Sequence, residues 1–195
     1  MTLYVLLIVA YLIGAIPTGV ILTRMVEGED IRNSGSGNIG ATNVYRVAGR
    51  KLGIITLIGD CLKGVIPLLI AQQGFNLSER GIALVALAAF IGHCYPIYLG
   101  FKGGKGVATA LGIFLVLSPL SVLCLLAFFG LVLWKWRYIS LASILAAATI
   151  PLLVLFFESS LPLFATALII ASIIIWRHRA NIERLRNGTE NKFKV

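Results

Sequence analysis

A glycine-rich basic run lies between two apolar segments near the middle of the chain. It reads KGGKG over residues 102–106. Glycine lets the backbone approach a ligand closely and turn its N–H groups toward an anion. A lysine beside such a turn supplies a point charge suited to phosphate. We therefore predict that Gly103, Gly104 and Lys105 bind the phosphate of a ligand whose other end is lipid.

A second candidate anion site reads NSGSGNIGATN over residues 33–43. Hydroxyl and amide side chains alternate with glycines, so backbone and side-chain donors can converge on an anion. An arginine three residues later can direct its forked guanidinium onto phosphate oxygens. A flexible loop is the alternative, since the same residue types make ordinary turns, but no lysine or glutamate occurs between Ser34 and Val44. The predicted contacts are Ser36, Gly37, Asn38, Thr42, Asn43 and Arg46.

Three ionisable residues lie within or at the end of apolar segments. Asp60 and Lys63 are three residues apart and so share one helix face. Ionisable groups inside a membrane are costly and usually face a cavity or each other. Two interpretations stay open: the pair neutralises itself and fixes helix packing, or it supports the phosphate site from behind. His93, just before Pro96, is assigned a similar supporting place, as a hydrogen-bonded structural residue rather than a catalyst.

The basic tail carries a further candidate pair, His178 and Asn181, which share a helix face three residues apart. His178 and Glu183 resemble the His-x4-Asp pair of many acyltransferases. A five-residue step rotates a helix by about 140°, however, so these two side chains do not meet and we reject the pair. Ser143 is a further candidate donor, although its hydroxyl can simply bond back to its own helix.

Composition defines the class of protein. The chain has 195 residues, of which 58% are hydrophobic and 13% charged, with a mean hydropathy of +0.94. So much apolar surface indicates a polytopic membrane protein. The net charge of +9 then reflects topology and anionic lipid headgroups rather than nucleic acid. The three cysteines lie in or beside apolar runs without metal-ligand spacing, and we expect no metal site.

Apolar segments predict an all-α fold. Five read clearly as membrane spans, over residues 2–23, 53–72, 81–100, 139–157 and 161–176. The stretch 107–133 is too long for one span and short for two. Two spans, broken between Ser118 and Ser121, put every basic loop on one side, as the positive-inside rule favours. Proline at position 119 disfavours helix in the residue before it and is tolerated early in the next helix.

We predict a seven-transmembrane-helix bundle forming a single domain over residues 1–195, with the N-terminus outside and the C-terminus cytoplasmic. Of the 17 lysine and arginine residues, only Arg80 then lies outside and only Lys63 within a span, which leaves the other 15 cytoplasmic. No positive charge precedes the first span, and Arg24 follows it, so this span is an anchor and not a cleavable signal.

This topology gathers the polar segments 24–51, 101–106, 135–143 and the tail from residue 177 on the cytoplasmic side. Such a face suits an enzyme acting on a membrane-dissolved phosphate ester. A transporter of organic anions also needs basic groups at a bundle mouth, but it more often shows an internal repeat and broken helices near the midplane. We find no convincing repeat in the sequence. A structural subunit or lipid-binding scaffold would not need two glycine-rich loops.

Five segments of the chain resemble the bacterial acyl-phosphate:glycerol-3-phosphate acyltransferases, the PlsY family. They read SGSGNIGATNVYRVAG (34–49), GDCLKG (59–64), GHCYPIYLGFKGGKGVATALG (92–112), WRYISLASI (136–144) and HRANIERLRNGTE (178–190). The resemblance implies transfer of a fatty acyl group from acyl phosphate to the sn-1 hydroxyl of glycerol 3-phosphate. Lysophosphatidate and inorganic phosphate would be the products, at the first step of phospholipid synthesis. It also implies a bacterial inner-membrane enzyme without a cofactor, functionally linked to the enzyme that makes acyl phosphate.

Under this resemblance the predicted catalytic residues are Arg46, Lys105, His178 and Asn181. One phosphate would lie near these four and Ser36. The other would lie on the amides around Gly103 and Gly104, with Thr42, Asn43 and Ser143 as further donors. No residue is an obvious general base, and acyl phosphate is already activated, so positioning and charge stabilisation can supply most of the acceleration. We therefore expect a donor phosphate oxygen to accept the hydroxyl proton, with His178 as the competing base.

Overall fold

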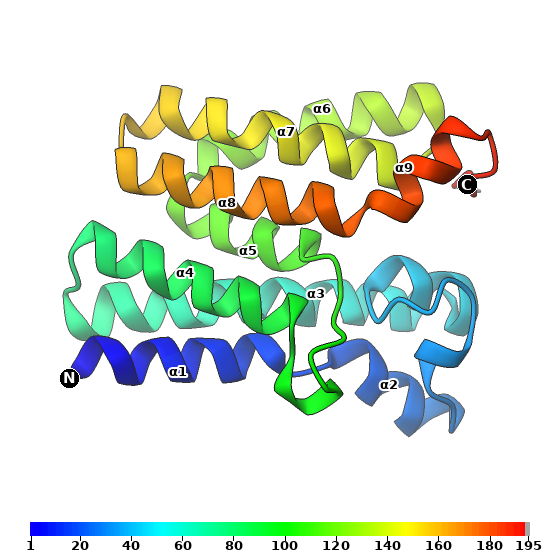
Figure 1. Cartoon of the computed structure of the whole chain (residues 1–195), viewed down its shortest axis with the longest axis horizontal. Coiled ribbons are helices and arrows are strands. Elements are labelled where there is room, and N and C mark those ends of the chain that lie inside the picture. The colour runs from blue at the N-terminus through cyan, green and yellow to red at the C-terminus, as the bar shows by residue number, and fades with distance from the viewer. Residues whose placement is uncertain (194–195) are drawn as a thin grey trace. The chain divides into compact units, whose positions relative to one another are not determined.

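The computed structural model describes residues 1–193, and its regular elements are helical throughout that range (Figure 1). The predicted all-α class is therefore confirmed. The α-helices are α1 (Thr2–Ala15), α2 (Thr18–Glu27), α3 (Ala41–Phe75), α4 (Glu79–Cys94), α5 (Val107–Leu117), α6 (Pro119–Trp136), α7 (Ile139–Glu158), α8 (Leu161–Arg177) and α9 (Arg179–Arg186). Two short 3-10 turns, η1 (Ile31–Asn33) and η2 (Ile97–Leu99), lie in the loops before α3 and α5.

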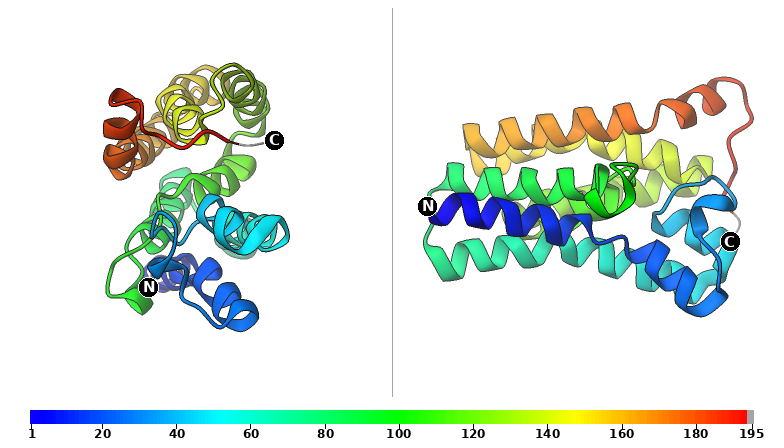
Figure 2. Two further views of the ribbon diagram at one scale, coloured as in Figure 1. Left: turned by 90° about the vertical axis from the view of Figure 1, so that its right-hand side faces the viewer. Right: turned by 60° about the horizontal axis from the view of Figure 1, so that its bottom comes forward.

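The chain forms two compact units, of which the first covers Met1–Val116 and the second begins at Leu117. In the first unit α1, α3 and α4 pack side by side, and α2 packs on α3 (Figure 2). In the second unit α7 packs against both α6 and α8, and α9 contacts α7 and α8. The single-domain assignment over residues 1–195 stays a prediction.

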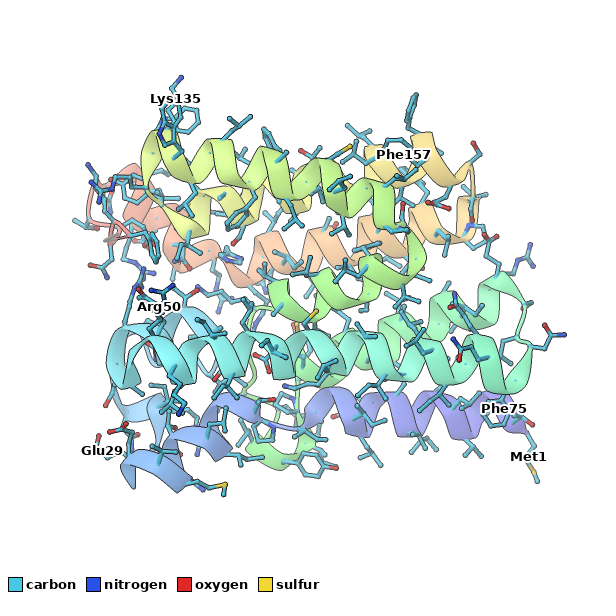
Figure 3. The ribbon with its side chains drawn as sticks, turned by 180° about the vertical axis from the view of Figure 1, so that it is seen from behind. Met1, Glu29, Arg50, Phe75, Lys135 and Phe157 are labelled. Atoms are coloured by element: carbon cyan, nitrogen blue, oxygen red, sulfur yellow. The ribbon has the colours of Figure 1, made fainter. Side chains whose placement is uncertain are left out.

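Five segments of the described chain are long and apolar enough to cross a membrane. They are Thr2–Glu27, Ala41–Phe75, Glu79–Leu99, Pro119–Trp136 and Ile139–Glu158. The pair α8 and α9, bent by 56°, would make a sixth, and α5 is a shorter apolar helix. Within the first unit Met1 and Phe75 lie at one end, and Glu29 and Arg50 lie at the other (Figure 3). The loop that contains Glu29 therefore lies at the end of the unit opposite Met1.

The predicted break in the stretch 107–133 is present. Helix α5 ends at Leu117, and Pro119 begins α6. Ser118 between them is non-helical, with φ −155° and ψ 73°, because the proline ring disfavours helical geometry in the residue before it. The buried Ser118 hydroxyl lies 2.7 Å from the Ser121 hydroxyl and donates to Glu158 Oε1 at 2.7 Å. These contacts give both serine hydroxyls beside the break a hydrogen-bond partner.

Two helix boundaries differ from the prediction. The segment 2–23 is not continuous, since Pro17 separates α1 from α2 by removing a backbone donor and restricting Ile16. The polar stretch 24–51 is not all loop, because α3 begins at Ala41 and is kinked at Gly49, where φ is 86°. Its first turns are helical because Val44 is fully buried in an apolar cluster with residues of α2 and η1.

Helix α5 lies against α3 at very short range. A Cβ at Gly64 would overlap the Thr109 carbonyl, and a Cβ at Gly112 would overlap the Cys61 carbonyl. Small residues of this kind let membrane helices bring their backbones together. The Thr109 hydroxyl also donates to the Asp60 carbonyl at 3.0 Å. The start of α5 is therefore fixed to the middle of α3.

Candidate active site

The loop before α3 is folded around the side chain of one residue, Asn43. Asn43 is 2% exposed, and its Nδ2 lies 2.9 Å from the Asn38 carbonyl, 3.1 Å from the Ser34 carbonyl and 3.3 Å from the Ile31 carbonyl. Its Oδ1 accepts from the Ser36 amide at 2.8 Å. The segment is thus an ordered loop rather than a flexible linker. The amide of Asn43 shapes this loop, and a direct contact with phosphate stays a prediction.

The tip of this loop needs glycine. Gly35 and Gly37 have φ of 61° and 68°, the left-handed region that glycine adopts without strain. Asn38 Oδ1 accepts from the Gly40 amide at 2.9 Å, which directs the chain into α3. Ser36 and Gly37 are consequently exposed at the tip.

The first turn of α3 carries two further predicted contacts. Thr42 is partly exposed and Arg46 is exposed; four residues apart on a helix, they share one face. The helix begins after Gly40, whose backbone is extended. The N-terminus of an α-helix carries unpaired N–H groups and a partial positive charge, both of which favour an anion. These two residues can therefore face the same anion as the start of the helix.

The second glycine-rich loop folds back onto the end of α4. The Gly104 amide donates to the His93 carbonyl at 3.1 Å. A Cβ at Gly103 would overlap the His93 carbonyl, and one at Gly104 would overlap the His93 imidazole. Lys105 follows, partly exposed, before Gly106 turns the chain into α5 with φ 85°. Close packing therefore requires glycine here, and the charge of Lys105 comes directly after it.

The structure brings the three predicted supporting residues together. Asp60, Lys63 and His93 are 2%, 4% and 3% exposed. Asp60 Oδ1 forms an ion pair with Lys63 Nζ and lies 3.9 Å from His93 Nδ1. The sequence predicted the first contact from the spacing on one helix, whereas the second depends on how α3 packs on α4.

The remaining predicted residues lie in the second unit. His178, 3% exposed, joins α8 to α9, and its Nδ1 lies 2.8 Å from the Ile174 carbonyl. A carbonyl can only accept, so Nδ1 carries the hydrogen in this contact. Asn181 is 6% exposed and lies one turn later on α9. The Ser143 hydroxyl bonds back to the Ile139 carbonyl at 2.8 Å, as the structural alternative expects.

Glu190 is a residue of this region that sequence reasoning did not assign. It is 8% exposed and accepts hydrogen bonds from Ser140 at 2.7 Å, Asn181 at 2.8 Å and Arg184 at 2.7 Å. Burial raises the pKa of its carboxyl, but the three donors together outweigh burial and hold that pKa below its ordinary value. The ionised Glu190 carboxylate therefore connects α7 with α9 through hydrogen bonds. An acid in a basic tail was the only signal of it in the sequence.

A second acid, Asp30, forms ion pairs with two arginines of the segment 24–51. Asp30 pairs with Arg24 at 2.6 Å and with Arg32 at 2.6 Å. The hydrogen bond from the Arg32 side chain is the largest cause holding the pKa of Asp30 far below its ordinary range. The same pairing raises the pKa of Arg32. These two arginines thus fix the turn after α2.

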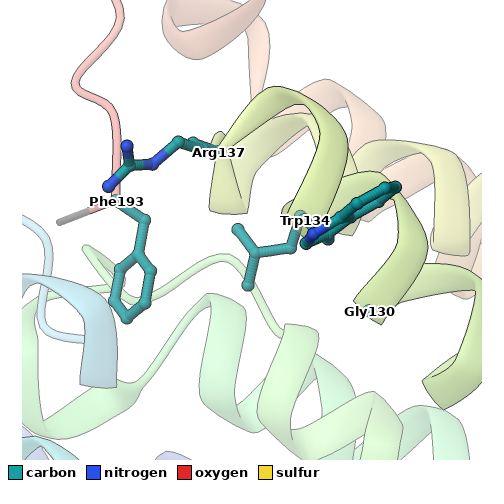
Figure 4. Close-up of a pocket in the computed structure, with 5 residues that line it drawn as sticks. Gly130, Trp134, Arg137 and Phe193 are labelled. Atoms are coloured by element: carbon teal, nitrogen blue, oxygen red, sulfur yellow. The ribbon is translucent and has the colours of Figure 1, made fainter. Parts of the chain in front are cut away.

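A surface cavity of about 520 Å³ lies in the second unit at the end of α6 (Figure 4). It is lined by Gly130, Leu133, Trp134, Arg137 and Phe193. The Phe193 amide donates to the Arg137 carbonyl at 2.6 Å, which holds the C-terminal segment against α6. None of the predicted phosphate-binding residues lines this cavity. Within residues 1–193, no group of three His, Cys, Asp or Glu side chains is placed to hold a metal ion.

Comparison with known proteins places the whole chain in one family. The family model described as glycerol-3-phosphate acyltransferase matches residues 4–188. A glycerol-3-phosphate acyltransferase of Syntrophotalea carbinolica is 66% identical over 192 residues, which cover 98% of each chain. Two crystal structures of PlsY, an integral membrane glycerol 3-phosphate acyltransferase, are 41% identical and cover 100% of this chain and 96% of theirs. The TM-score is 0.94 for the glycerol 3-phosphate form and 0.89 for the lysophosphatidic acid form.

These likenesses agree with the apolar helices described above, and the protein is a multi-pass membrane protein. The predicted resemblance to the PlsY family is confirmed over nearly the full length, including both glycine-rich loops and the tail through Gly188. The chain belongs to the glycerol-3-phosphate acyltransferase family.

Proposed function

We propose that this protein transfers a fatty acyl group from acyl phosphate to the sn-1 hydroxyl of glycerol 3-phosphate, releasing lysophosphatidate and inorganic phosphate. The observation that carries the proposal is the full-length match to solved structures whose two forms are named for the acceptor and for the acylated product. Acyl phosphate as the donor is the finer part of the proposal. It is supported by two glycine-rich loops, because both proposed substrates bear a phosphate.

Ser36, Arg46 and Lys105 are proposed phosphate ligands of the first unit, and His178 and Asn181 are proposed phosphate ligands of the second unit. One observation supports each of two residues in the first unit: the Ser36 amide is hydrogen-bonded to Asn43 at the loop tip, and Lys105 directly follows a tightly packed turn. His178 and Asn181 are supported by their fixed side chains, each bonded within the second unit. Ionised donors make stronger hydrogen bonds to phosphate than neutral ones.

The second phosphate is assigned to the backbone amides around Gly103 and Gly104, with Thr42 and Asn43 of the same unit as further donors. Ser143, in the second unit, is also a proposed donor. The close packing of this turn on α4 supports the assignment, because backbone donors held in place cost no reorganisation when the reaction occurs. Asn43 and Ser143 already bond within the protein. Asn43 also holds the amide of Ser36 in position.

The proposed reaction needs no nucleophile from the protein. The sn-1 oxygen attacks the acyl carbon and forms the new ester bond, while the bond between that carbon and the phosphate oxygen breaks. The proton of the hydroxyl passes to a phosphate oxygen of the donor, and phosphate leaves. Lys105 and the backbone amides stabilise the charge that develops. His178 is the competing base through Nε2, the acceptor nitrogen of a neutral ring whose Nδ1 donates to Ile174.

The finer topology is also part of the proposal: seven transmembrane helices, N-terminus outside, C-terminus and active site cytoplasmic, in the bacterial inner membrane. The separate short helix α5 supports seven helices, and the distribution of lysine and arginine supports the orientation. Acyl phosphate must be supplied by another enzyme, which is the proposed functional partner.

The deciding experiment measures phosphate release by the purified protein in lipid, with palmitoyl phosphate as donor. We expect release only when glycerol 3-phosphate is added, together with lysophosphatidate detected by mass spectrometry. Palmitoyl-CoA is the control donor and should give no product. Folded protein that releases no phosphate from palmitoyl phosphate, or that uses palmitoyl-CoA equally well, would contradict the donor assignment.

A further inference from the structure

Three ionisable side chains are buried together in the first unit, within segments apolar enough to cross a membrane. Asp60 and Lys63 belong to Ala41–Phe75 and His93 to Glu79–Leu99, and each is at least 96% buried. Burying a charge costs several kcal/mol even after the protein relaxes. Ionisable residues at such positions usually mark a functional site. The question is which function these three serve.

A packing function alone accounts for only part of the cluster. Asp60 and Lys63 neutralise each other on one face of α3, and this pair could fix the helix without further help. His93 comes from a different helix, however, and its Nδ1 lies 3.9 Å from the same Asp60 oxygen. A charge pair made only for packing has no need of a third ionisable group.

The opposite edge of the His93 ring faces the glycine-rich loop. The atom that a Cβ at Gly104 would meet first is His93 Nε2. The Gly104 amide also donates to the His93 carbonyl. The imidazole therefore lies between the buried carboxylate on its Nδ1 side and the backbone of Gly104 on its Nε2 side.

The other end of the same loop is tied to the same turn of α3. The loop passes into α5 at Val107, and Thr109 of α5 donates to the Asp60 carbonyl at 3.0 Å. Asp60 thus contacts the elements on both sides of the loop, through its side chain toward His93 and through its backbone toward Thr109. Asp60 is therefore placed to influence the loop through its side chain, while its backbone carbonyl anchors the start of α5.

We propose that Asp60, Lys63 and His93 are positioning residues that fix the turn at Gly103 and Gly104. The Gly104 amide is used to anchor this turn on the His93 carbonyl, and the neighbouring backbone amides of the loop are thereby held for binding a phosphate group. The ion pair holds the Asp60 carboxylate beside His93, and the His93 imidazole packs against the turn at Gly104. The phosphate is that of the substrate bound on this turn, or the inorganic phosphate formed from it. This inference rests on the proposed function of the glycine-rich loop as a phosphate site.

The first test compares two substitutions of His93 that each keep one edge of the ring. Glutamine places its amide near the position of Nε2, and asparagine places its amide near that of Nδ1. We expect His93→Asn to raise the KM of one phosphate substrate by tenfold or more, and to raise the inhibition constant of inorganic phosphate by the same factor. The KM of the other substrate should rise by less than threefold. His93→Gln should recover most of this loss. Loss of kcat with both KM values unchanged would overturn the proposal.

The second test uses the steric relationship between the ring and the turn. Gly104→Ala alone should abolish at least nine-tenths of kcat/KM, because its Cβ overlaps the imidazole. In the His93→Ala background the same substitution has room, and the double variant should be at least as active as His93→Ala. Equal losses from Gly104→Ala in both backgrounds would contradict support of the turn by His93.

The third test removes the charges. Asp60→Asn leaves Lys63 buried without its counter-ion and can prevent folding, so the neutral double variant Asp60→Asn/Lys63→Met accompanies it. We expect the same selective rise in one KM, whereas unchanged KM values for both substrates would show that the pair serves packing only. Thr56→Val is the matched control, because Thr56 is a buried polar residue one turn earlier on α3 that bonds only to Leu52 in its own helix.

Failure of this inference and failure of the proposed function give different results. Wild-type protein that shows no glycerol 3-phosphate-dependent phosphate release refutes the proposed function itself. Active wild-type protein with unaltered KM values in the folded variants refutes only the positioning role. Melting temperature and elution volume in detergent establish which variants are folded.

Discussion

The amide of Asn181 donates a hydrogen bond of 2.8 Å to the carboxylate of Glu190. Asn181 is predicted to bind substrate. Glu190 is buried and also accepts hydrogen bonds from Ser140 and Arg184. A buried acceptor thus sets the orientation of a predicted binding side chain. The segment after α9 therefore orients a residue that is predicted to bind substrate.

Glu190→Gln should destabilise the protein by about 1–3 kcal/mol, the typical effect of disturbing hydrogen bonds to a buried charged group. The glutamine cannot serve three donors as the carboxylate does, so activity should fall as well. Thermal unfolding and phosphate release measure the two effects. Glu183→Gln is the control, because Glu183 is an exposed acid on α9. A loss as large as that of Glu190→Gln would contradict this role.

The same residue predicts how stability depends on pH. The folded-state pKa of Glu190 lies below its ordinary value of 4.5, so the ionised carboxylate favours the folded state. Its contribution should be fully present above about pH 4.5 and should be lost as the pH falls through the folded-state pKa. The difference in melting temperature between wild type and Glu190→Gln should therefore shrink below pH 4.5. A difference in melting temperature that grows on acidification would refute the predicted direction of this pH dependence.

Asn43→Ala should raise the KM of glycerol 3-phosphate or acyl phosphate by about tenfold or more, because the loop that carries Ser36 loses its central amide. Removing one partner of a buried hydrogen bond costs about 1–3 kcal/mol, and this loop has several such bonds. Asn33→Ala, at an exposed position of the same loop, should change the KM by less than twofold. Equal kinetics for the two variants would show that the loop keeps its shape without Asn43.

Lys105→Ala should lower kcat/KM by about ten- to a hundredfold, which corresponds to the 1.5–3 kcal/mol of a charged hydrogen bond. Lys102→Ala provides the comparison, since Lys102 is an exposed lysine of the same loop and its loss should have little effect. Steady-state kinetics with varied glycerol 3-phosphate and palmitoyl phosphate test both. Similar losses in the two variants would indicate a general effect of positive charge and not a bound phosphate.

His178→Gln separates the two proposed mechanisms. If a donor phosphate oxygen accepts the proton, the variant should keep kcat within about tenfold, because glutamine can still donate a hydrogen bond, while the KM rises. If His178 is the base, kcat alone should fall by about a thousandfold or more, consistent with the range for general base catalysis. Single-turnover measurements of product formation distinguish these outcomes.

The sequence predicted those features that depend on residues close together in the chain. The Asp60–Lys63 pair follows from three-residue spacing on a helix, and the break at Ser118 follows from the proline after it. Both involve neighbours whose relative position is set by local geometry. The break after Ile16 had the same proline signal, but the apolar run on both sides of it concealed the interruption.

Contacts between residues far apart in the sequence could not be predicted, because local geometry does not set their relative position. Glu190 reaches Asn181 only because a turn at Gly188, with φ 69°, brings the chain back on itself. His93 meets Asp60 only through the packing of α4 on α3. Asn43 was predicted as a ligand from its residue type, and the sequence did not indicate that its amide is occupied by its own loop.

The position of Glu190 also limits how the protein can be shortened or extended. A version that ended directly after α9 would keep Arg46, Lys105, His178 and Asn181, yet it would lack the carboxylate that Asn181 and Arg184 bind. A fusion partner joined near Gly188 would compete for the same turn. A shortened version that keeps the hydrogen bonds of Asn181 and Arg184 to this carboxylate must therefore extend through Glu190.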